Sequence, residues 1–249
     1  MNDAQRIRLD QFLSENGFAE TRSRARDLIL RGAVRVDGGV VTKPGALVAP
    51  GRSIEVDGAQ NPYVSRGGLK LEYALKHYGF SPEGVIAIDA GSSTGGFSDV
   101  LLRGGAKRVY GVDVGTGQLH ASLRHEPRMI VLEGTDVRNL TPEIIPEPVT
   151  SIVSDVSFIS LTQALPPAMS FAAPGAWLVA LIKPQFELEA REIGKGGIVR
   201  SEEARLRAVD KVAAWLAGCP GWRALEPVQS PITGKGGNIE YLIGATFDG

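Results

Sequence analysis

The chain has 249 residues, of which 43% are hydrophobic and 22% charged, enough for one domain of moderate size and one small module. Its 27 lysines and arginines against 28 aspartates and glutamates give a net charge of −1, which excludes a protein that is basic over its whole surface. The single cysteine, Cys219, excludes a disulfide framework and a cysteine-cluster metal site. With no apolar run of about 18 residues and no signal-peptide pattern, we expect a soluble cytoplasmic protein without a membrane partner.

Residues 1–58 predict a small α+β module. Apolar residues at helical spacing indicate two helices, with Leu9, Phe12 and Leu13 in the first and Ala25, Leu28 and Ile29 in the second. Gly17 is a suitable stop for the first helix, and Thr21 a suitable N-cap for the second. Short strands are expected at 34–36, 40–41 and 54–56. We place a linker at 59–64 and a second domain at 65–249.

The second domain alternates between strand-like and helix-like segments. A first helix ends at Gly79, and the buried strands that follow are expected at 85–89, 108–113, 129–132, 151–155 and 176–183. Ser201 begins a strong later helix, and two final strands around 222–229 and 239–247 can pair as a hairpin. This alternation predicts an open, doubly wound α/β sheet with right-handed crossovers. The tetrapeptide Gly-Lys-Gly-Gly, at 194–197 and 234–237, indicates two flexible loops rather than a duplication.

A glycine-rich turn follows the first of these strands. The segment Asp89-Ala-Gly-Ser-Ser-Thr-Gly-Gly-Phe97 lets the backbone approach a ligand closely and then opens a helix. Asp113 ends the next strand, where a carboxylate can bind ribose hydroxyls, and Asp136 follows the third strand, where an adenine could lie. The glycine spacing matches neither a dinucleotide fingerprint nor a phosphate-binding P-loop. The pattern therefore favours S-adenosylmethionine over those ligands, and an ordinary tight turn is the alternative.

The expected cofactor contacts come from this turn and from the two strand ends. They are Asp89, Gly91, Ser93, Thr94, Gly95, Gly96, Phe97, Asp113 and Asp136.

Four ionisable residues stand at strand ends or beside them. Lys70 precedes the first strand, Asp155 ends the fourth and Lys183 ends the fifth. Glu240 opens the last, antiparallel strand. Since the carboxyl ends of the central strands form one crevice, we expect all four side chains to meet there. Each of them taken alone is typical of a solvated strand end, so it is their combination that indicates a catalytic site.

Four segments of the second domain carry further motifs: Ser65-Arg-Gly-Gly-x-Lys70, the glycine turn at 89–97, Ser154-Asp-Val-Ser-Phe-Ile-Ser160 and Leu181-Ile-Lys-Pro-Gln-Phe-Glu187. Together with the N-terminal module, they resemble the TlyA (hemolysin A) family. The resemblance implies an RNA-binding fold named after small-subunit ribosomal protein four, joined to an FtsJ-like methyltransferase domain with a seven-stranded Rossmann-like sheet. It implies 2′-O-methylation of cytidine in ribosomal RNA with S-adenosylmethionine, and it maps the family's Lys-Asp-Lys-Glu tetrad onto Lys70, Asp155, Lys183 and Glu240.

These residues suggest roles for a methyl transfer to a ribose hydroxyl. Our hypothesis makes Lys183 the base or proton-handling group, with Asp155 orienting it and with Lys70 and Glu240 positioning the ribose. His77, His120 and His125 lack a paired metal spacing, so we expect no metal site.

An arginine cluster in the N-terminal module predicts the RNA contact. Between residues 21 and 35, five arginines and one aspartate give a local charge of +4. The cluster is Arg22, Arg24, Arg26, Arg31 and Arg35, and Arg6 and Arg8 can extend it. Such a patch suits phosphate contacts with ribosomal RNA or ribosomal subunits, and a merely solvated helix face is the alternative.

Two other functions are weighed against the enzyme. A non-catalytic RNA-binding or ribosome-assembly factor would not need all four ionisable residues of the crevice. A membrane-lysing hemolysin would need an amphipathic membrane segment with a basic face, and none stands out.

Overall fold

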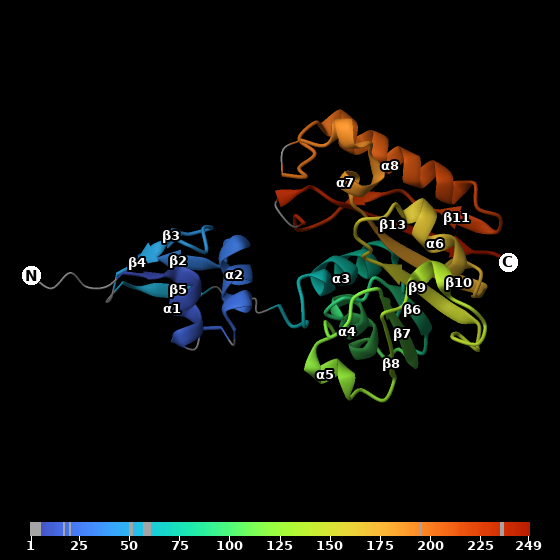
Figure 1. Ribbon diagram of the computed structural model, residues 1–249, viewed down its shortest axis with the longest axis horizontal. Coiled ribbons are helices and arrows are strands. Elements are labelled where there is room, and N and C mark those ends of the chain that lie inside the picture. Colours follow the sequence, from blue (N-terminus) through green and yellow to red (C-terminus); the bar gives the residue numbers. More distant parts are fainter. Residues whose placement is uncertain are drawn as a thin grey trace, which may run out of the picture. The chain divides into compact units, whose positions relative to one another are not determined.

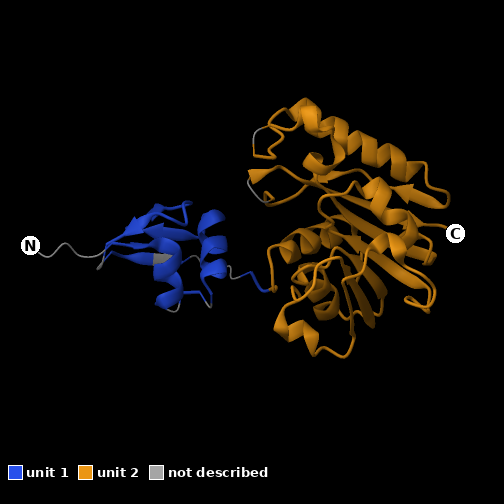
Figure 2. Cartoon of the chain, in the orientation of Figure 1, with its two compact units in different colours: residues 1–62 blue, residues 63–249 orange. Residues whose placement is uncertain are grey.

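The computed structural model describes residues 6–16, 18–19, 21–49, 52–56, 61–194, 196–234 and 237–249. The chain forms two compact units, Met1–Pro62 and Tyr63–Gly249 (Figure 2). Of the positions named above, Gly17, residues 59–60 of the expected linker, Lys195, Lys235 and Gly236 lie outside the described residues.

The described residues of the first unit form two helices and two small sheets. Its elements are β1 (Ile7–Arg8), α1 (Leu9–Glu15), α2 (Arg22–Leu30), β2 (Val34–Val36), β3 (Gly39–Val40), β4 (Leu47–Val48) and β5 (Ile54–Val56). The strands pair antiparallel in the order β3-β2-β5, and separately as β1-β4. The predicted N-cap is confirmed, because Thr21 Oγ1 accepts a hydrogen bond from Arg24 N at 3.1 Å. Strands β1 and β4 were not predicted, since two-residue strands are too short to show alternation.

The second unit contains all the remaining elements. Its strands are β6 (Ile86–Ala90), β7 (Arg108–Asp113), β8 (Met129–Glu133), β9 (Val149–Ser154), β10 (Ala172–Ile182), β11 (Trp222–Ala224), β12 (Val228–Gln229) and β13 (Tyr241–Phe247). Its helices are α3 (Gly67–Tyr78), α4 (Gly96–Arg103), α5 (Ala121–Arg124), α6 (Leu161–Met169), α7 (Pro184–Glu187) and α8 (Glu202–Ala217), with short 3-10 turns η1 (Val137–Asn139) and η2 (Ala190–Glu192).

The strands of this unit form one twisted sheet in the order β11-β13-β10-β9-β6-β7-β8 (Figure 1). Strands β6 to β10 are parallel to one another, and β13 runs antiparallel between β10 and β11. The predicted doubly wound α/β fold is therefore confirmed. The described residues add one short strand to the seven expected, because residues 225–227 separate β11 from β12 and both pair with β13.

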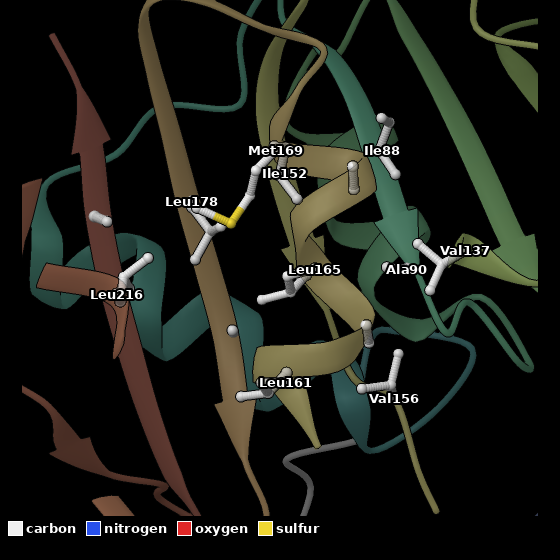
Figure 3. Packing of buried hydrophobic residues seen from close by; sticks show 14 of the residues in the cluster. Ile88, Ala90, Val137, Ile152, Val156, Leu161, Leu165, Met169, Leu178 and Leu216 are labelled. Carbon is white, nitrogen blue, oxygen red and sulfur yellow. The ribbon is translucent and has the colours of Figure 1, made fainter. Parts of the chain in front are cut away.

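Helices cover both faces of the sheet, as the alternating sequence predicted. On one face α6 and α8 bury residues such as Leu165 and Leu216 against β6, β9 and β10 (Figure 3). On the other face α3 and α4 bury residues such as Leu71 and Leu101. Burial of both faces explains why the central strands appear as continuous apolar runs in the sequence.

The strand order reverses between β6 and β9, which are parallel neighbours. From β6 the chain proceeds outward to β7 and β8, whereas from β9 it proceeds to β10 on the other side. Loops leaving the carboxyl ends of β6 and β9 therefore diverge and leave a crevice between them. Every group predicted for the active site lies in a segment that begins or ends at this edge of the sheet.

Candidate active site

The glycine turn connects β6 to α4 at the edge of the crevice. Gly91 has a φ of +83°, and a Cβ placed on it would lie 2.9 Å from the Cα of Val156 in the loop after β9. Gly95, with a φ of +90°, precedes the first residue of α4. The backbone nitrogens of Gly91 and Ser92 both donate to Val112 O, at 2.8 and 3.1 Å. These glycines allow the turn to pack tightly against the adjacent loops.

A cavity of about 760 Å³ lies at this edge of the sheet and contains most of the predicted residues. Its lining includes Lys70, Gly91, Ser93, Asp113, Asp136, Asp155, Lys183 and Glu240. The expected cofactor contacts that are not part of the lining are Asp89, Thr94, Gly95, Gly96 and Phe97. Phe97, the second residue of α4, is buried in the hydrophobic cluster that α3 and α4 form with the sheet.

Asp113 holds the loop that borders one end of the cavity. Its Oδ2 accepts a hydrogen bond from Ser93 N at 2.8 Å, and its Oδ1 accepts one from Gly115 N at 2.7 Å. An ionised carboxylate has about four acceptor positions, so both oxygens can still accept hydrogen bonds from a ligand. Gln118, whose Oε1 accepts from Ser93 Oγ at 3.1 Å, adds a second polar side chain to this end of the cavity.

Asp136 caps the short η1 turn that follows β8. Its Oδ1 accepts from Arg138 N at 2.9 Å, and its Oδ2 forms an ion pair with Arg138 Nη2 at 2.6 Å. The hydrogen-bonded guanidinium of Arg138 lowers the pKa of this carboxyl below its usual range. Both side chains line the cavity, so a ligand at this end would face a neutralised pair rather than a free carboxylate.

Glu133, at the end of β8, organises the loop between β7 and α5. Its carboxylate accepts hydrogen bonds from the backbone nitrogens of Gly117, Gln118 and Leu119, at 2.9, 2.9 and 3.1 Å. These backbone donors, Leu119 foremost, lower the pKa of Glu133 to about 2. This residue was not predicted, because the sequence does not show which backbone groups a glutamate at a strand end will contact.

Asp89 lies fully buried beneath the glycine turn. Its Oδ2 accepts a hydrogen bond from Ser98 Oγ at 2.6 Å, whereas its Oδ1 has no hydrogen-bond partner among the described residues. Burial, opposed by the Ser98 bond and reinforced by the nearby Asp155, raises the pKa of Asp89 to about 7. This carboxyl therefore changes its protonation state near neutral pH. It stands two positions before Gly91, which lines the cavity.

Lys70 and Glu240 form a buried ion pair at the other end of the cavity. Lys70, on α3, donates from Nζ to Glu240 Oε2 at 2.5 Å, and the two side chains are 9% and 2% exposed. The ammonium and the carboxylate compensate each other, which allows two charges to remain in a desolvated position.

The loop that precedes β13 is shaped to place Glu240. A Cβ on Gly234 would lie 1.8 Å from Glu240 Oε1, so only glycine leaves room for the carboxylate in its present position. Gly234 N donates to Asn238 O at 2.8 Å, which closes the turn. The Asn238 side chain then accepts from Val199 N at 3.0 Å and donates to Gly197 O at 2.9 Å. The hydrogen bond from Asn238 to Gly197 thus links the loops of the two Gly-Lys-Gly-Gly segments beside the site.

Lys183 lies between Asp155 and Ser157. Its Nζ is 2.7 Å from Asp155 Oδ1, 3.2 Å from Asp155 O and 2.7 Å from Ser157 Oγ. Three neighbouring oxygens fix the amine at the cavity wall, where only 11% of the side chain is exposed. Ser157 was not predicted, although it lies in the segment 154–160 on which the family resemblance rests.

An exposed aromatic residue stands at the mouth of the cavity. Phe158 is 90% exposed and has a φ of +67°, a left-handed conformation that is uncommon for a residue with a large side chain. Its ring centroid lies 5.0 Å from that of Phe186, and both rings line the cavity. A strained backbone that presents a large apolar side chain to solvent indicates a functional position. Exposure cannot be read from the sequence, so this residue was missed.

Comparisons with known proteins show the family of this chain. A family model described as FtsJ-like methyltransferase matches residues 63–247, and an S4 domain model matches residues 7–54. The chain belongs to the FtsJ-like methyltransferase family. It is 42% identical to the 16S/23S rRNA (cytidine-2'-O)-methyltransferase TlyA of Mycobacterium tuberculosis, over 96% of this chain and 90% of the relative.

Two further relatives bear a different name. Hemolysin A of Brachyspira hyodysenteriae is 42% identical over 95% of this chain and 98% of its own. A solved structure from Streptococcus thermophilus, also named a hemolysin, superimposes on this chain with a TM-score of 0.75. The two chains are 38% identical, and the match covers 98% of this chain and 89% of that chain. In this FtsJ-like methyltransferase, no helix within the described residues is long and apolar enough to cross a membrane. The same residues contain no cluster of three or more His, Cys, Asp or Glu that could hold a metal ion.

The arginines of the S4 domain that were predicted to contact RNA have different surroundings. Asp10 is buried and forms ion pairs with Arg8 at 2.8 Å and Arg22 at 3.3 Å, and these arginines, Arg8 foremost, lower its pKa. Arg24 donates to the backbone of Asn61. Arg26 lies one helical turn after Arg22 on α2 and is exposed. Some arginines of the cluster therefore also serve the fold of this domain, and those exposed to solvent are Arg6, Arg8, Arg22 and Arg26.

Proposed function

We propose that this FtsJ-like methyltransferase transfers a methyl group from S-adenosylmethionine to the ribose 2′-hydroxyl of a cytidine in ribosomal RNA. The observation that supports it best is the convergence of two lysine–carboxylate pairs, Lys70–Glu240 and Lys183–Asp155, on one cavity beside the glycine turn. The identity to an enzyme named for this reaction, over nearly the whole chain, supports the same substrate.

The lining of the cavity fits S-adenosylmethionine at the end away from Lys70. Gly91 brings the backbone to the cavity wall, and Asp113 and Ser93 offer polar groups that suit ribose hydroxyls. Asp136, with its backbone and its Arg138 partner, borders the place where an adenine would lie. When bound, the cofactor supplies a methyl group on a positively charged sulfur, which is ready for displacement by an oxygen nucleophile.

The two lysine–carboxylate pairs have different tasks in this proposal. Lys183, as the neutral amine, takes the proton of the 2′-hydroxyl and becomes an ammonium as the oxygen attacks, while Asp155 and Ser157 hold the nitrogen in place. Lys70 and Glu240, buried and mutually neutralised, hold the ribose through hydrogen bonds without adding net charge. Positioning of the hydroxyl provides a large share of the rate, and the proton transfer provides about 10²–10⁴-fold.

Phe158 completes the site by receiving the target base. An enzyme that reaches a ribose hydroxyl within folded RNA must unstack the nucleotide, and recognition of such bases commonly uses stacking on aromatic side chains. The exposed ring of Phe158 at the cavity mouth, backed by Phe186, offers this surface. Base stacking on an aromatic ring contributes about 1–3 kcal/mol, which offsets part of the cost of unstacking.

The S4 domain supplies the remaining RNA contact in this proposal. Its exposed cationic side chains, Arg26 among them, suit phosphates, which fix position and carry little sequence information. Ribosomal RNA or a ribosomal subunit is therefore the proposed partner, and it places the enzyme in the cytoplasm.

The test is transfer of tritium from methyl-labelled S-adenosylmethionine to ribosomal RNA, followed by mapping of 2′-positions that become resistant to alkali. We expect label at defined cytidines, and in a single turnover on bound RNA we expect Lys183→Ala to slow transfer at least about 100-fold. Lys107→Ala serves as the matched control. This exposed lysine directly precedes β7, so it lies at the amino ends of the parallel strands, whereas the cavity lies at their carboxyl ends.

Two results would reject the proposal. The first is absence of ribose label in ribosomal RNA and in both ribosomal subunits, and the second is near wild-type single-turnover transfer by Lys183→Ala. Leakage of liposomes in the presence of the protein would support the membrane-lysing alternative instead.

A further inference from the structure

A second cavity, of about 420 Å³, adjoins the active-site cavity. The two share four lining residues, Phe158, Ile159, Gln185 and Phe186. The tilted pair of aromatic rings, with centroids 5.0 Å apart, therefore borders both spaces. A volume of this size lies within the range of small-ligand sites, and nothing in the proposed reaction yet uses it.

Hydrogen bonds between three helices hold the wall of this second cavity. Glu187, at the end of α7, is 5% exposed and its carboxylate accepts hydrogen bonds from Ser160 Oγ at 2.5 Å and Leu161 N at 2.8 Å. Lys211, on α8, donates from Nζ to Glu187 O at 2.7 Å. Helices α6, α7 and α8 are thereby joined around the cavity, so its shape is formed before any ligand enters.

The lining offers amide groups that are free to bind. Gln163, exposed on α6, lines only the second cavity. Gln185 lines both, and its Oε1 is buried without a hydrogen-bond partner among the described residues. A buried acceptor without a donor costs stability unless a ligand or water satisfies it, so the position of Gln185 indicates a ligand with a hydrogen-bond donor.

The charges around the cavity exclude a phosphate as its main occupant. Glu187 and Glu189 both line it, and Glu189 is paired with Arg191 at 2.9 Å. Lys211 is the one cationic residue of the lining among the described residues, and it lies 3.6 Å from the Glu187 carboxylate. Aromatic rings beside amide groups, without net positive charge, suit a neutral, flat and polar-edged molecule, which is the chemistry of a nucleobase.

We infer that the second cavity binds the unpaired base of the nucleotide next to the methylated cytidine along the RNA strand. The inference rests on the proposed function, because a strand that places its target ribose at Lys183 must continue past Phe158. The ring of Phe158 separates the target base from its neighbour, and the amides of Gln163 and Gln185 contact the edge of the neighbouring base. The protein thus selects its substrate by two adjacent unstacked bases.

The test removes the neighbouring base and one of its contacts, separately and together. Ribosomal RNA is prepared with a ligated synthetic segment that carries an abasic nucleotide on the 5′ or the 3′ side of the mapped target. With the wild-type enzyme, we expect one of these two substitutions to lower kcat/KM for methylation about tenfold. With Gln163→Ala, we expect lower kcat/KM on intact RNA and a loss of less than about threefold from the same abasic substitution, because the contact is already absent.

Ser170→Ala is the control, since Ser170 is exposed at the far end of the same helix and lines neither cavity. It should respond to the abasic RNA as the wild type does. The inference is overturned if the wild type tolerates abasic nucleotides on both sides, or if the losses from Gln163→Ala and from the abasic nucleotide multiply. Absence of methylation of intact RNA by the wild type is a separate result, and it would reject the proposed function and this inference with it.

Discussion

The Nζ of Lys70 lies 2.5 Å from Oε2 of Glu240, although 170 residues separate them in the sequence. Lys70 comes from α3, which precedes the first strand of the sheet, and Glu240 directly precedes the last strand, β13. Because β13 is antiparallel, it begins at the edge of the sheet where the parallel strands end, which places Glu240 there. The pair therefore joins the two ends of the methyltransferase domain at the candidate active-site cavity.

The first prediction separates stability from function at this pair. Lys70→Met leaves the Glu240 carboxylate buried and uncompensated, so we expect it to lower the free energy of unfolding by about 3–5 kcal/mol. Lys70→Met combined with Glu240→Leu should recover most of that loss, because an apolar pair replaces the ionic one, yet stay inactive. Urea unfolding and methyl-transfer assays measure the two effects. A double variant with wild-type activity would show that the pair serves the fold alone.

Gly234 should be essential to activity through Glu240. A Cβ at this position would lie 1.8 Å from Glu240 Oε1, so we expect Gly234→Ala to displace the carboxylate and to reduce the methyl-transfer rate at least about tenfold. Gly218→Ala is the matched control in the same domain, because its φ is −84° and its Cβ would come no closer than 3.4 Å to any atom. Equal rates for both variants would contradict the proposed positioning.

Asp89 should make the stability of the methyltransferase domain depend on pH. Its pKa is about 7 in the folded protein, against an ordinary value of 3.8, so the folded state holds the extra proton between about pH 4 and pH 7. The contribution of this group to stability is therefore present at low pH and is lost as the pH rises through 7. Asp89→Asn cannot ionise, and we expect its urea midpoint to fall less than that of the wild type between pH 5.5 and pH 8. Parallel pH profiles would disprove the assignment.

Arg26 should contribute to RNA binding without affecting the cofactor. Reversal of its charge in Arg26→Glu places an anion on the exposed face of α2, so we expect weaker binding of ribosomal RNA and a salt slope reduced by about one. Affinity for S-adenosylmethionine, measured by calorimetry, should stay unchanged. Arg223→Glu, an exposed position on β11, controls for the change in net charge. Loss of cofactor affinity in Arg26→Glu would indicate misfolding instead.

Much of the fold was readable because buried parallel strands leave a strong signal. The apolar runs at 108–113 and 129–132 became β7 and most of β8, and Ser201 caps α8 through a bond from Ala204 N to its Oγ at 3.2 Å. Weak signals failed where elements are short. The two-residue strands β1 and β4 depend on each other for pairing, and no local pattern indicates them.

The sequence by itself determined the order of elements, the glycine turn and the residue types that meet at the strand ends, because periodicity, turn chemistry and motif spacing are local properties. Only the tertiary structure decided which groups pair. It joined Lys70 to Glu240 and Lys183 to Asp155, put Ser157 and Gly234 in their places, and left Phe158 exposed. Distances, burial and exposure depend on how segments far apart in the chain pack together, and that packing is a property of the whole fold.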